Sequence, residues 1–216
     1  MRDLTRCRSR LARDQAEVKI KLRDVLARQN RQAPYRSPFG PRGLAWFRGQ
    51  DFGPIENLIR DELLERCTHY RRQLAILDQH LAGIAEAFPQ VEVLTEIHGI
   101  GLYSALLIVG ELGEVDRFRN ARQVDAYAGL TSRVQQSGGH RYQGSITRQG
   151  SPWLRWVLVE AAMKVVREDV ALKNFYTRVR KRSSAKIARV AVARKLAEIC
   201  WKRLRRWQAE HAGRAA

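Results

Sequence analysis

Two long segments in the first half of the chain carry apolar residues at helical spacing. Between residues 3 and 32 there is no Gly or Pro. Apolar side chains recur there every seven residues, at Leu4, Leu11, Val18 and Val25, and Leu22 adds part of a second apolar row. From Glu56 to Phe88 the spacing between apolar residues alternates between four and three positions, as at Tyr70, Leu74, Leu77, Leu81, Ile84 and Phe88. This spacing predicts two long helices, which pair as an antiparallel hairpin or pair with a second subunit.

The apolar pattern is interrupted between these two helices. Residues 33–54 contain four prolines and four glycines, which break helices. We therefore expect a loop or linker in this segment, with Trp46 and Phe47 holding it in place. Residues 1–88 are predicted to form one helical hairpin or coiled-coil region.

Pro89 ends the second helix, and the pattern beyond it predicts a compact helical domain over residues 89–208. Short helices are expected over 91–97 and 102–112, from Asn120 to about Gly129, near 170–181, and from Ser184 onward with Ile187 on its apolar face. Ser151 before Pro152 is typical of a helix start, and the helix after it carries one apolar face: Leu154, Val157, Leu158, Ala161 and Val165. Residues 209–216, rich in Ala and Arg, are expected to form a disordered tail.

A polar, glycine-rich stretch separates two of these short helices. Residues 130–150 contain too many Gly and polar side chains for a helix. We expect an irregular loop or a short β-hairpin that pairs residues 141–143 with residues 145–147. The predicted fold class is mainly α: a long helical hairpin or coiled coil, then a compact helical domain with this short β-hairpin or loop.

Charge changes the picture in the last third of the chain. The 40 Lys and Arg residues exceed the 22 Asp and Glu residues by 18. Residues 1–33 hold ten basic and four acidic side chains, a net charge of +6, and residues 34–139 hold eleven basic and thirteen acidic ones, a net charge of −2. Residues 140–216 hold nineteen basic and five acidic side chains, a net charge of +14. A polyanion is the simplest partner for so uneven an excess. A solvated charged surface is the alternative, and an anionic membrane fits less well because the basic segments lack a clean apolar face.

Several other classes of protein are disfavoured. No apolar run approaches the ~20 residues that span a bilayer, and the N-terminus has no signal-peptide core, so we expect a cytoplasmic protein without a membrane partner. Cys7, Cys67 and Cys200 form no C-x-x-C pair, which leaves three buried reduced thiols as the simplest interpretation. The acidic residues make no recognisable metal pattern, and no nucleotide-binding motif occurs. We predict neither a metal site nor a cofactor in this chain.

The segment around Gly99 and Gly101 has the shape of a helix-hairpin-helix motif. The two glycines flank Ile100, which would anchor a tight turn in the core. The helix after the turn would present free N–H groups and the positive end of its dipole, which suits a phosphate. A plain structural turn is the alternative, because any helical hairpin can use Gly-Ile-Gly.

A second candidate site lies in the glycine-rich stretch, at Ser137. A serine becomes a nucleophile toward a phosphodiester only where its proton is removed and the phosphate charge is neutralised. Two glycines would let the backbone approach the phosphate and three arginines would stabilise its charge: Gly138, Gly139, Arg141, Arg148 and Arg155. From residue types alone, an ordinary turn serine is the simpler interpretation of Ser137.

Four segments beyond residue 90 occur in a recognisable order and spacing: HGIGLYSALLIVGELGEVDRF, QVDAYAGL, QSGGHRYQGSITRQGSPWLRWVLVEAA and KIARVAVARKLAEICWKRL. Together they resemble the C-terminal domain of the IS110/IS116/IS902 family of insertion-sequence transposases, over about residues 90–207. The first predicted helix is similar to the segment that joins the two catalytic domains of that family. The resemblance implies a function in DNA transposition and recombination.

The resemblance also implies roles and partners. In this family a serine in a Ser-Gly motif, here Ser137-Gly138, is thought to form a covalent link to DNA, which favours Ser137 as the catalytic residue. Family members pair this domain with an N-terminal RuvC-like domain that holds divalent metal on four acidic residues. This chain begins about where that domain should end, so we expect the acidic domain and its metal to be missing. DNA, a structured noncoding RNA and further copies of the chain are the partners that the family implies.

These expectations lead to two hypotheses. In the first, the chain is the DNA-binding C-terminal part of an insertion-sequence transposase, with Ser137 as candidate nucleophile, and is inactive alone because the acidic domain is absent. In the alternative, it is a stand-alone nucleic-acid-binding regulatory remnant that oligomerises with intact transposase. A basic RNA-associated helical protein would leave the glycine-rich stretch unexplained.

Overall fold

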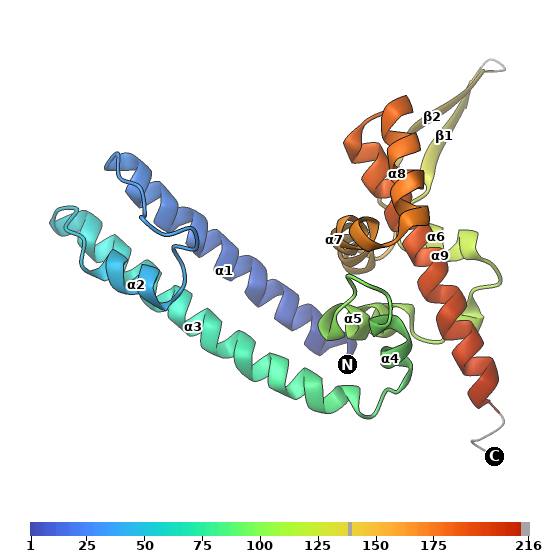
Figure 1. Ribbon diagram of the computed structural model, residues 1–216, viewed down its shortest axis with the longest axis horizontal. Coiled ribbons are helices and arrows are strands. Elements are labelled where there is room, and N and C mark those ends of the chain that lie inside the picture. The colour runs from blue at the N-terminus through green and yellow to red at the C-terminus, as the bar shows by residue number, and fades with distance from the viewer. Residues whose placement is uncertain (138–139, 213–216) are drawn as a thin grey trace. The chain divides into compact units, whose positions relative to one another are not determined.

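The computed structural model describes residues 1–137 and 140–212, with the side chains of residues 134–143 outside that description. The described residues are mainly α-helical, with one two-stranded sheet among them (Figure 1). The chain divides into two units, one of Arg6–His80 and the other of Met1–Thr5 with Leu81–Ala216. The division thus falls at Leu81, near the expected boundary after residue 88, and the first five residues belong with the second unit.

The first unit is a helical hairpin formed by most of α1 (Arg2–Arg28) and α3 (Pro54–Ala85). The two guanidinium nitrogens Nε and Nη2 of Arg8 donate to the two carboxylate oxygens of Asp78, at 2.9 and 3.1 Å. Further along, Val18 and Leu22 belong to the same buried cluster as Leu64. Because residues early in α1 meet residues late in α3, the helices are antiparallel, and the hairpin alternative is realised within the chain.

A short helix, α2 (Pro41–Arg48), lies in the segment that was predicted to be a loop, so that prediction was wrong. The prolines and glycines act here as a helix start and as a close contact. Pro41 stands at the beginning of α2, where proline is favoured. A Cβ atom on Gly43 would overlap the backbone carbonyl of Pro38, so only glycine fits. Leu44 and Phe47 of α2 are buried, so the hydrophobic core of the unit extends to this end of the hairpin.

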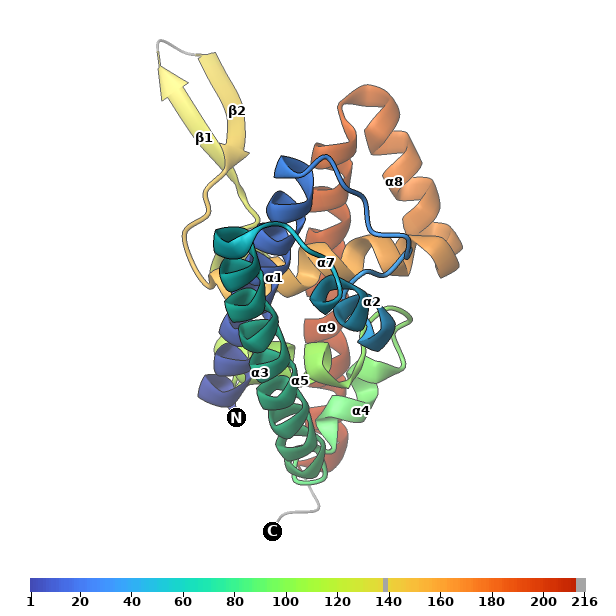
Figure 2. The same ribbon diagram turned by 90° about the vertical axis from the view of Figure 1, so that its left-hand side faces the viewer.

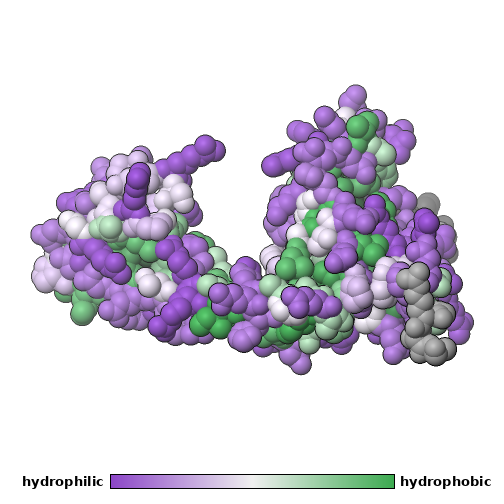
Figure 3. Space-filling view, turned by 60° about the horizontal axis from the view of Figure 1, so that its bottom comes forward, coloured by the Kyte–Doolittle hydropathy of each residue, from purple (hydrophilic) through white to green (hydrophobic). Residues whose placement is uncertain are grey.

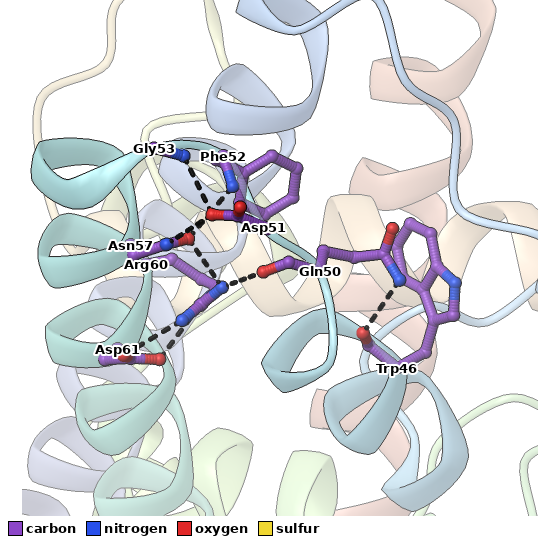
Figure 4. A network of polar contacts seen from close by, with 8 residues as sticks. All are labelled: Trp46, Gln50, Asp51, Phe52, Gly53, Asn57, Arg60 and Asp61. Atoms are coloured by element: carbon purple, nitrogen blue, oxygen red, sulfur yellow. Dashed lines mark hydrogen bonds and ion pairs between the residues drawn. The ribbon is translucent and has the colours of Figure 1, made fainter.

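A polar network around Arg60 fastens the connection after α2 to α3 (Figure 4). Arg60 is 6% exposed; its Nη1 donates to the carbonyl of Gln50 and to Oδ1 of Asn57, and its Nε donates to Asp61 at 2.9 Å. The amide of Asn57 donates in turn to Asp51 at 2.7 Å. That hydrogen bond, together with the one from the Gly53 N–H, holds the pKa of Asp51 below its usual range.

In the second unit, helices surround a central buried helix, α5 (Leu102–Leu112), whose bounds match the prediction. Every residue of α5 from Ala105 to Leu112 is buried. It packs against α4 (Gln90–Thr95) and α7 (Pro152–Glu168). The unit also contains the 3-10 turn η1 (Val115–Arg117), α6 (Ala121–Tyr127), α8 (Val170–Arg182) and α9 (Ala185–His211). The long helix α9 packs against α4, α6, α7, α8 and η1, so it joins the other elements into one core.

The predicted helix starts are confirmed by their capping hydrogen bonds. The side chains of Asn120, Ser151 and Ser184 accept from the backbone N–H three residues later. Asp169 caps α8 in the same way, at 2.8 Å to Leu172, and was not predicted. Such caps satisfy backbone donors that a helix leaves free at its start.

Two expectations about burial were wrong. Ile187 is 56% exposed, because the inner face of α9 is formed instead by Ala188, Val192, Leu196, Cys200 and Leu204. Cys7 is exposed, whereas Cys67 and Cys200 are buried free thiols, and burial raises the pKa of Cys200 to about 12. The last helix also continues to His211, beyond the expected end of the domain at residue 208, and residues 213–216 of the expected tail lie outside the described residues.

The β-hairpin exists, but with a different pairing from the one predicted. Strand β1 (Ser132–Ser137) is antiparallel to β2 (His140–Ile146), with Ser132 opposite Ile146 and Ser137 opposite His140. The predicted arms, 141–143 and 145–147, fall mostly in β2, because Gly144 does not end that strand. The overlooked sequence signal is a Gly-Gly pair between two short runs, a pattern typical of hairpins; Gly138 and Gly139 themselves lie outside the described residues. Figures 1 and 2 show the strands standing away from the helices of their unit.

The visible surface is largely hydrophilic. In Figure 3, hydrophilic residues cover most of the face shown, with smaller apolar patches between them. Among the described residues, no helix is long and apolar enough to cross a membrane.

We expect Arg60→Met to weaken the first unit by about 1–3 kcal/mol, because buried partners of the guanidinium lose their hydrogen bonds. Native-state hydrogen exchange of the α2 and α3 amides measures this change. The matched variant Arg42→Met removes an exposed arginine of the same unit and should change these free energies by less than about 0.5 kcal/mol. Equal effects of the two substitutions would contradict a structural role for the Arg60 network.

Candidate nucleic-acid interface

Ser137, the predicted nucleophile, is the last residue of β1 and lies at the tip of the hairpin. Arg141 occupies β2 opposite Gln136, one pair closer to the helical body. Gly138 and Gly139 lie outside the described residues, as do the side chains of Ser137 and Arg141. Five strand residues at ~3.3 Å each place Ser137 about 17 Å from the base of the hairpin.

The base of the hairpin is held closed by backbone hydrogen bonds. The N–H of Thr147 donates to the carbonyl of Thr131 at 2.8 Å, and the N–H of Ser151 donates to the carbonyl of Tyr127 at 2.7 Å. Gly150 adopts a φ of +111°, and a Cβ atom there would overlap the Tyr127 carbonyl. The chain therefore enters and leaves the hairpin beside the end of α6.

Arg155 joins the two legs of the hairpin at this base. Its Nη1 donates to the carbonyl of Ala128 on one side and of Arg148 on the other, both at 3.2 Å. Burial lowers the pKa of Arg155, and the nearby charge of Arg148 lowers it further. Gly129, with a φ of +66°, lies so close that a Cβ atom would overlap Nη1 of Arg155. One nitrogen of this guanidinium is thus committed to the backbone, which gives Arg155 a structural role beside its predicted role in phosphate binding.

Arg148 is exposed at the base and adopts a φ of +56°, uncommon for a residue other than glycine. Its backbone is fixed on one side by Arg155 and on the other by the turn at Gly150. The structure therefore places Arg148 and Arg155 together, about 17 Å from Ser137 along the strands. They are too far from the tip to share with Ser137 the single phosphate that the sequence interpretation suggested.

Two buried carboxylates brace the hairpin base, and sequence reasoning missed both. Glu111, in α5, accepts a 2.8 Å hydrogen bond from the hydroxyl of Ser151, the residue that also caps α7. Asp125, in α6, accepts a 2.6 Å bond from Nε of Arg194 in α9, and its other oxygen has no hydrogen-bond partner. Burial raises the pKa of Asp125, and Arg194 offsets part of that effect. The available signal was an acidic residue inside an apolar run, as in LLIVGEL.

The segment interpreted as a helix-hairpin-helix forms α4, a turn and α5, and Ile100 is buried in the core as predicted. Gly99 has a φ of +87°, and a Cβ atom there would lie 2.6 Å from the Cβ of Lys164 in α7. Gly101 has a φ of −83° and open space beside it, so a side chain fits there. Gly99 is therefore the constrained position of the turn, and Gly101 is not.

The turn and the hairpin base lie at opposite ends of α7. The hairpin base adjoins Ser151, at the start of α7, whereas Gly99 touches Lys164 and Val165 near its end. Thirteen residues at ~1.5 Å each separate Ser151 from Lys164 by about 20 Å. The predicted phosphate-binding residues thus form separate contact points: the turn, the hairpin base and the hairpin tip.

Known proteins are similar to this part of the chain. Residues 91–177 match the family model described as Transposase IS116/IS110/IS902 family. This segment contains the turn, both strands, α7 and the first half of α8. The predicted family resemblance is confirmed.

Individual relatives extend the similarity. A probable family 20 transposase of Pseudomonas aeruginosa is 29% identical over 157 residues, which cover 71% of this chain and 46% of that protein. The transposase for insertion sequence element IS1111A of Coxiella burnetii is 27% identical over 163 residues, 74% of this chain and 44% of that protein. A 43.6 kDa protein of insertion element IS110 from Streptomyces coelicolor is 25% identical over 126 residues, 58% of this chain and 31% of that protein. The chain spans about half the length of the first two of these relatives.

The two glycines of the turn should respond differently to the same substitution. Gly99→Ser is expected to lower the free energy of unfolding by about 2 kcal/mol, through the positive φ and the close approach to α7. Gly101→Ser should be neutral or stabilising by a few tenths of a kcal/mol, because serine is favoured at the residue before a helix. Urea unfolding of the full chain measures both, and a loss at Gly101 as large as that at Gly99 would contradict the geometry of the turn.

Asp125→Asn should change how stability depends on pH. Because the folded-state pKa of Asp125 is raised above 3.8, its contribution favours folding below pH 3.8 and is lost as pH rises through the folded-state pKa. The asparagine variant lacks this loss, so its free energy of unfolding should rise relative to wild type across that window. Parallel pH profiles of the two proteins in chemical denaturation would show that Asp125 does not titrate as proposed.

Proposed function

Because residues 91–177 carry the domain of the Transposase IS116/IS110/IS902 family, we propose that this chain binds DNA and takes part in moving an insertion sequence. The observation that carries the proposal is the hairpin, which lies inside the matched segment. Its tip holds Ser137, and its base is fixed by paired backbone and by buried Glu111 and Asp125. A projecting, braced strand pair can carry a reactive residue to a DNA backbone outside the helical body.

We propose Ser137 as the nucleophile of this reaction. Its hydroxyl oxygen attacks a backbone phosphorus, and the new Ser–O–P bond forms as the bond from phosphorus to one deoxyribose oxygen breaks. The serine proton leaves to a base, and the departing sugar oxygen takes up a proton. The energy of the phosphodiester is kept in the serine ester, so a second sugar hydroxyl can reverse the step and rejoin a strand.

The arginines along the hairpin support backbone binding at several phosphates. Arg141 lies next to the tip, and Arg148 lies at the base about 17 Å away. One DNA strand advances ~3.4 Å per nucleotide along the helix axis, so this distance corresponds to about five nucleotides. Gly99 and Gly101 offer a further contact at the start of α5, whose first N–H groups have no side-chain cap.

The proposal extends to partners but not to a metal. A structured noncoding RNA carries the same phosphate backbone as DNA and is proposed as a second polyanion partner, and homo-oligomers are proposed as the working form. Among the described residues, no group of three or more His, Cys, Asp or Glu side chains is placed to hold a metal ion, so we derive no step through one. Since the chain spans about half the length of its relatives, cleavage and rejoining are proposed for the whole protein.

The substitution Ser137→Ala separates the chemistry from the binding. In the whole protein, for which cleavage is proposed, any link to DNA that survives denaturation should disappear in the variant, while the affinity of the chain for duplex DNA changes by less than about twofold. Denaturing gel electrophoresis of labelled duplex measures the link, and fluorescence polarisation measures the affinity.

Two outcomes of that experiment would be decisive against the assignment. A denaturation-resistant link that persists in Ser137→Ala would place the nucleophile elsewhere. A wild-type chain without affinity for duplex DNA would overturn the binding function itself. A regulatory protein that only binds DNA, the alternative function, predicts intact binding and no such link in either protein.

A further inference from the structure

Helix α8 has five Lys and Arg residues among its thirteen and no Asp or Glu. α8 packs against α7 and α9 through buried Leu172 and the partly buried Phe175, Tyr176 and Val179. Beyond the exposed apolar residues Val170 and Ala171 at the start of the helix, the opposite face is polar and mostly basic, and its side chains are exposed: Lys173, Asn174, Thr177, Arg178, Lys181 and Arg182. The apolar face of the helix is thus already used inside the unit, and the basic face is left to solvent.

The cations of α8 differ from those of α9 in their surroundings. Between residues 170 and 197 the sequence has nine Lys and Arg residues and no Asp or Glu. The basic side chains of α9 repeatedly meet carboxylates, as in Arg194–Asp125 at 2.6 Å, Lys195–Glu198 at 3.2 Å and Arg206–Glu210 at 2.8 Å. Within the described part of the chain, no carboxylate pairs with Lys173, Arg178, Lys181 or Arg182.

This clustering is not explained by the stability of the helix alone. Basic residues in the last turn interact favourably with the helix dipole, which accounts for Lys181 and Arg182. Arg178, however, stands three and four residues before these two, and like charges at such spacing repel by about 0.2–0.5 kcal/mol per pair. A bound polyanion would remove that repulsion.

The side chains on this face also share a chemistry. Asn174, Thr177, Arg178, Lys181 and Arg182 line a hollow on the surface of α8. The amide, guanidinium and ammonium groups of Asn174, Arg178, Lys181 and Arg182 can donate hydrogen bonds to phosphate oxygens, which only accept them. The Thr177 hydroxyl already donates to the carbonyl of Lys173, at 2.9 Å. A hollow lined by donors without a carboxylate fits a phosphate group.

We propose that this outer face of α8 binds the phosphate backbone of duplex DNA, beyond the contacts of the hairpin and the turn. The inference rests on the proposed DNA-binding function and adds a surface to it. Thirteen residues at ~1.5 Å give α8 a length of about 20 Å, which corresponds to about six nucleotides of one strand. Arg178 and Arg182 are one turn apart, about 6 Å, so they reach phosphates about two nucleotides apart.

The experiment uses the full chain and a 30-base-pair DNA duplex in polarisation titrations from about 50 to 300 mM salt. The variant Arg178→Gln/Lys181→Gln/Arg182→Gln should lower the association constant about 10- to 100-fold at ~100 mM salt. The slope of log K against log salt should become shallower by about 2–3, because each lost phosphate contact removes about 0.9. The loss should be similar for unrelated DNA sequences, since phosphate contacts do not read bases.

A matched control removes the same charge from paired positions of the same unit. Lys195→Gln/Arg205→Gln/Arg206→Gln takes three cations that face Glu198, Asp116 and Glu210, and its slope should change by less than about 1. Arg178→Lys/Arg182→Lys keeps the charge and should keep the wild-type slope. Unchanged far-ultraviolet circular dichroism and thermal midpoints show that the variants fold.

The remaining outcomes separate the α8 surface from the proposed DNA-binding function. If wild type binds the duplex steeply with salt and the α8 variant keeps its slope, the α8 surface is overturned and the proposed function stands. If wild type does not bind the duplex, both the α8 surface and the proposed DNA-binding function are overturned. Equal losses of affinity in the α8 variant and the paired control would overturn the α8 surface, because only the total charge of the chain would then matter. If the α8 variant lost more affinity for a 30-base-pair RNA duplex, or for anionic lipid vesicles, than for the DNA duplex, the assignment to DNA would be overturned.

Discussion

Closure of the hairpin at its base is the constraint on which the proposed site depends. An isolated two-stranded hairpin is at best marginally stable in water, and within the part of the chain that the structure describes β1 and β2 pair only with each other. Their order must therefore come from the helical unit, through the Ser151–Tyr127 and Thr147–Thr131 bonds and the clamp of Arg155. Three non-standard backbone positions, Gly129, Arg148 and Gly150, make this close approach possible. Without it, Ser137 would have no defined position relative to the basic surfaces.

The buried acids extend this bracing into the core. Glu111 ties the departing leg of the hairpin to the central helix α5, and Asp125 ties the helix before the hairpin to α9. Each carboxylate is costly to bury, and each is compensated by a hydrogen bond from a residue distant in sequence. The polar groups of the core thus lie where they fix the orientation of the hairpin, while the apolar groups of α5, α7 and α9 supply most of the burial.

Features set by local sequence were predictable, and features set by distant contacts were not. The limits of α5 and the caps at Asn120, Ser151 and Ser184 follow from short-range patterns, and the structure has them. α2 was missed because Pro41 and Gly43 serve there as a helix start and a tight contact rather than as breakers. The separation of Arg148 and Arg155 from Ser137 depends on strand register, which residue types in a loop do not define. The roles of Glu111 and Asp125 depend on partners 40 and 69 residues away.

The position of α7 between two contact points has a consequence for how the sequence can vary. One end of the helix carries the cap that closes the hairpin, and the other end is packed against Gly99. Inserting or deleting a single residue in α7 would turn one end against the other by about 100° and move it by ~1.5 Å. Such a change would draw either Ser151 or Lys164 out of its contact. Because a whole added turn would keep the orientation of the two ends but move one of them by ~5.4 Å, we expect α7 to be a spacer of fixed length between the hairpin base and the turn at Gly99.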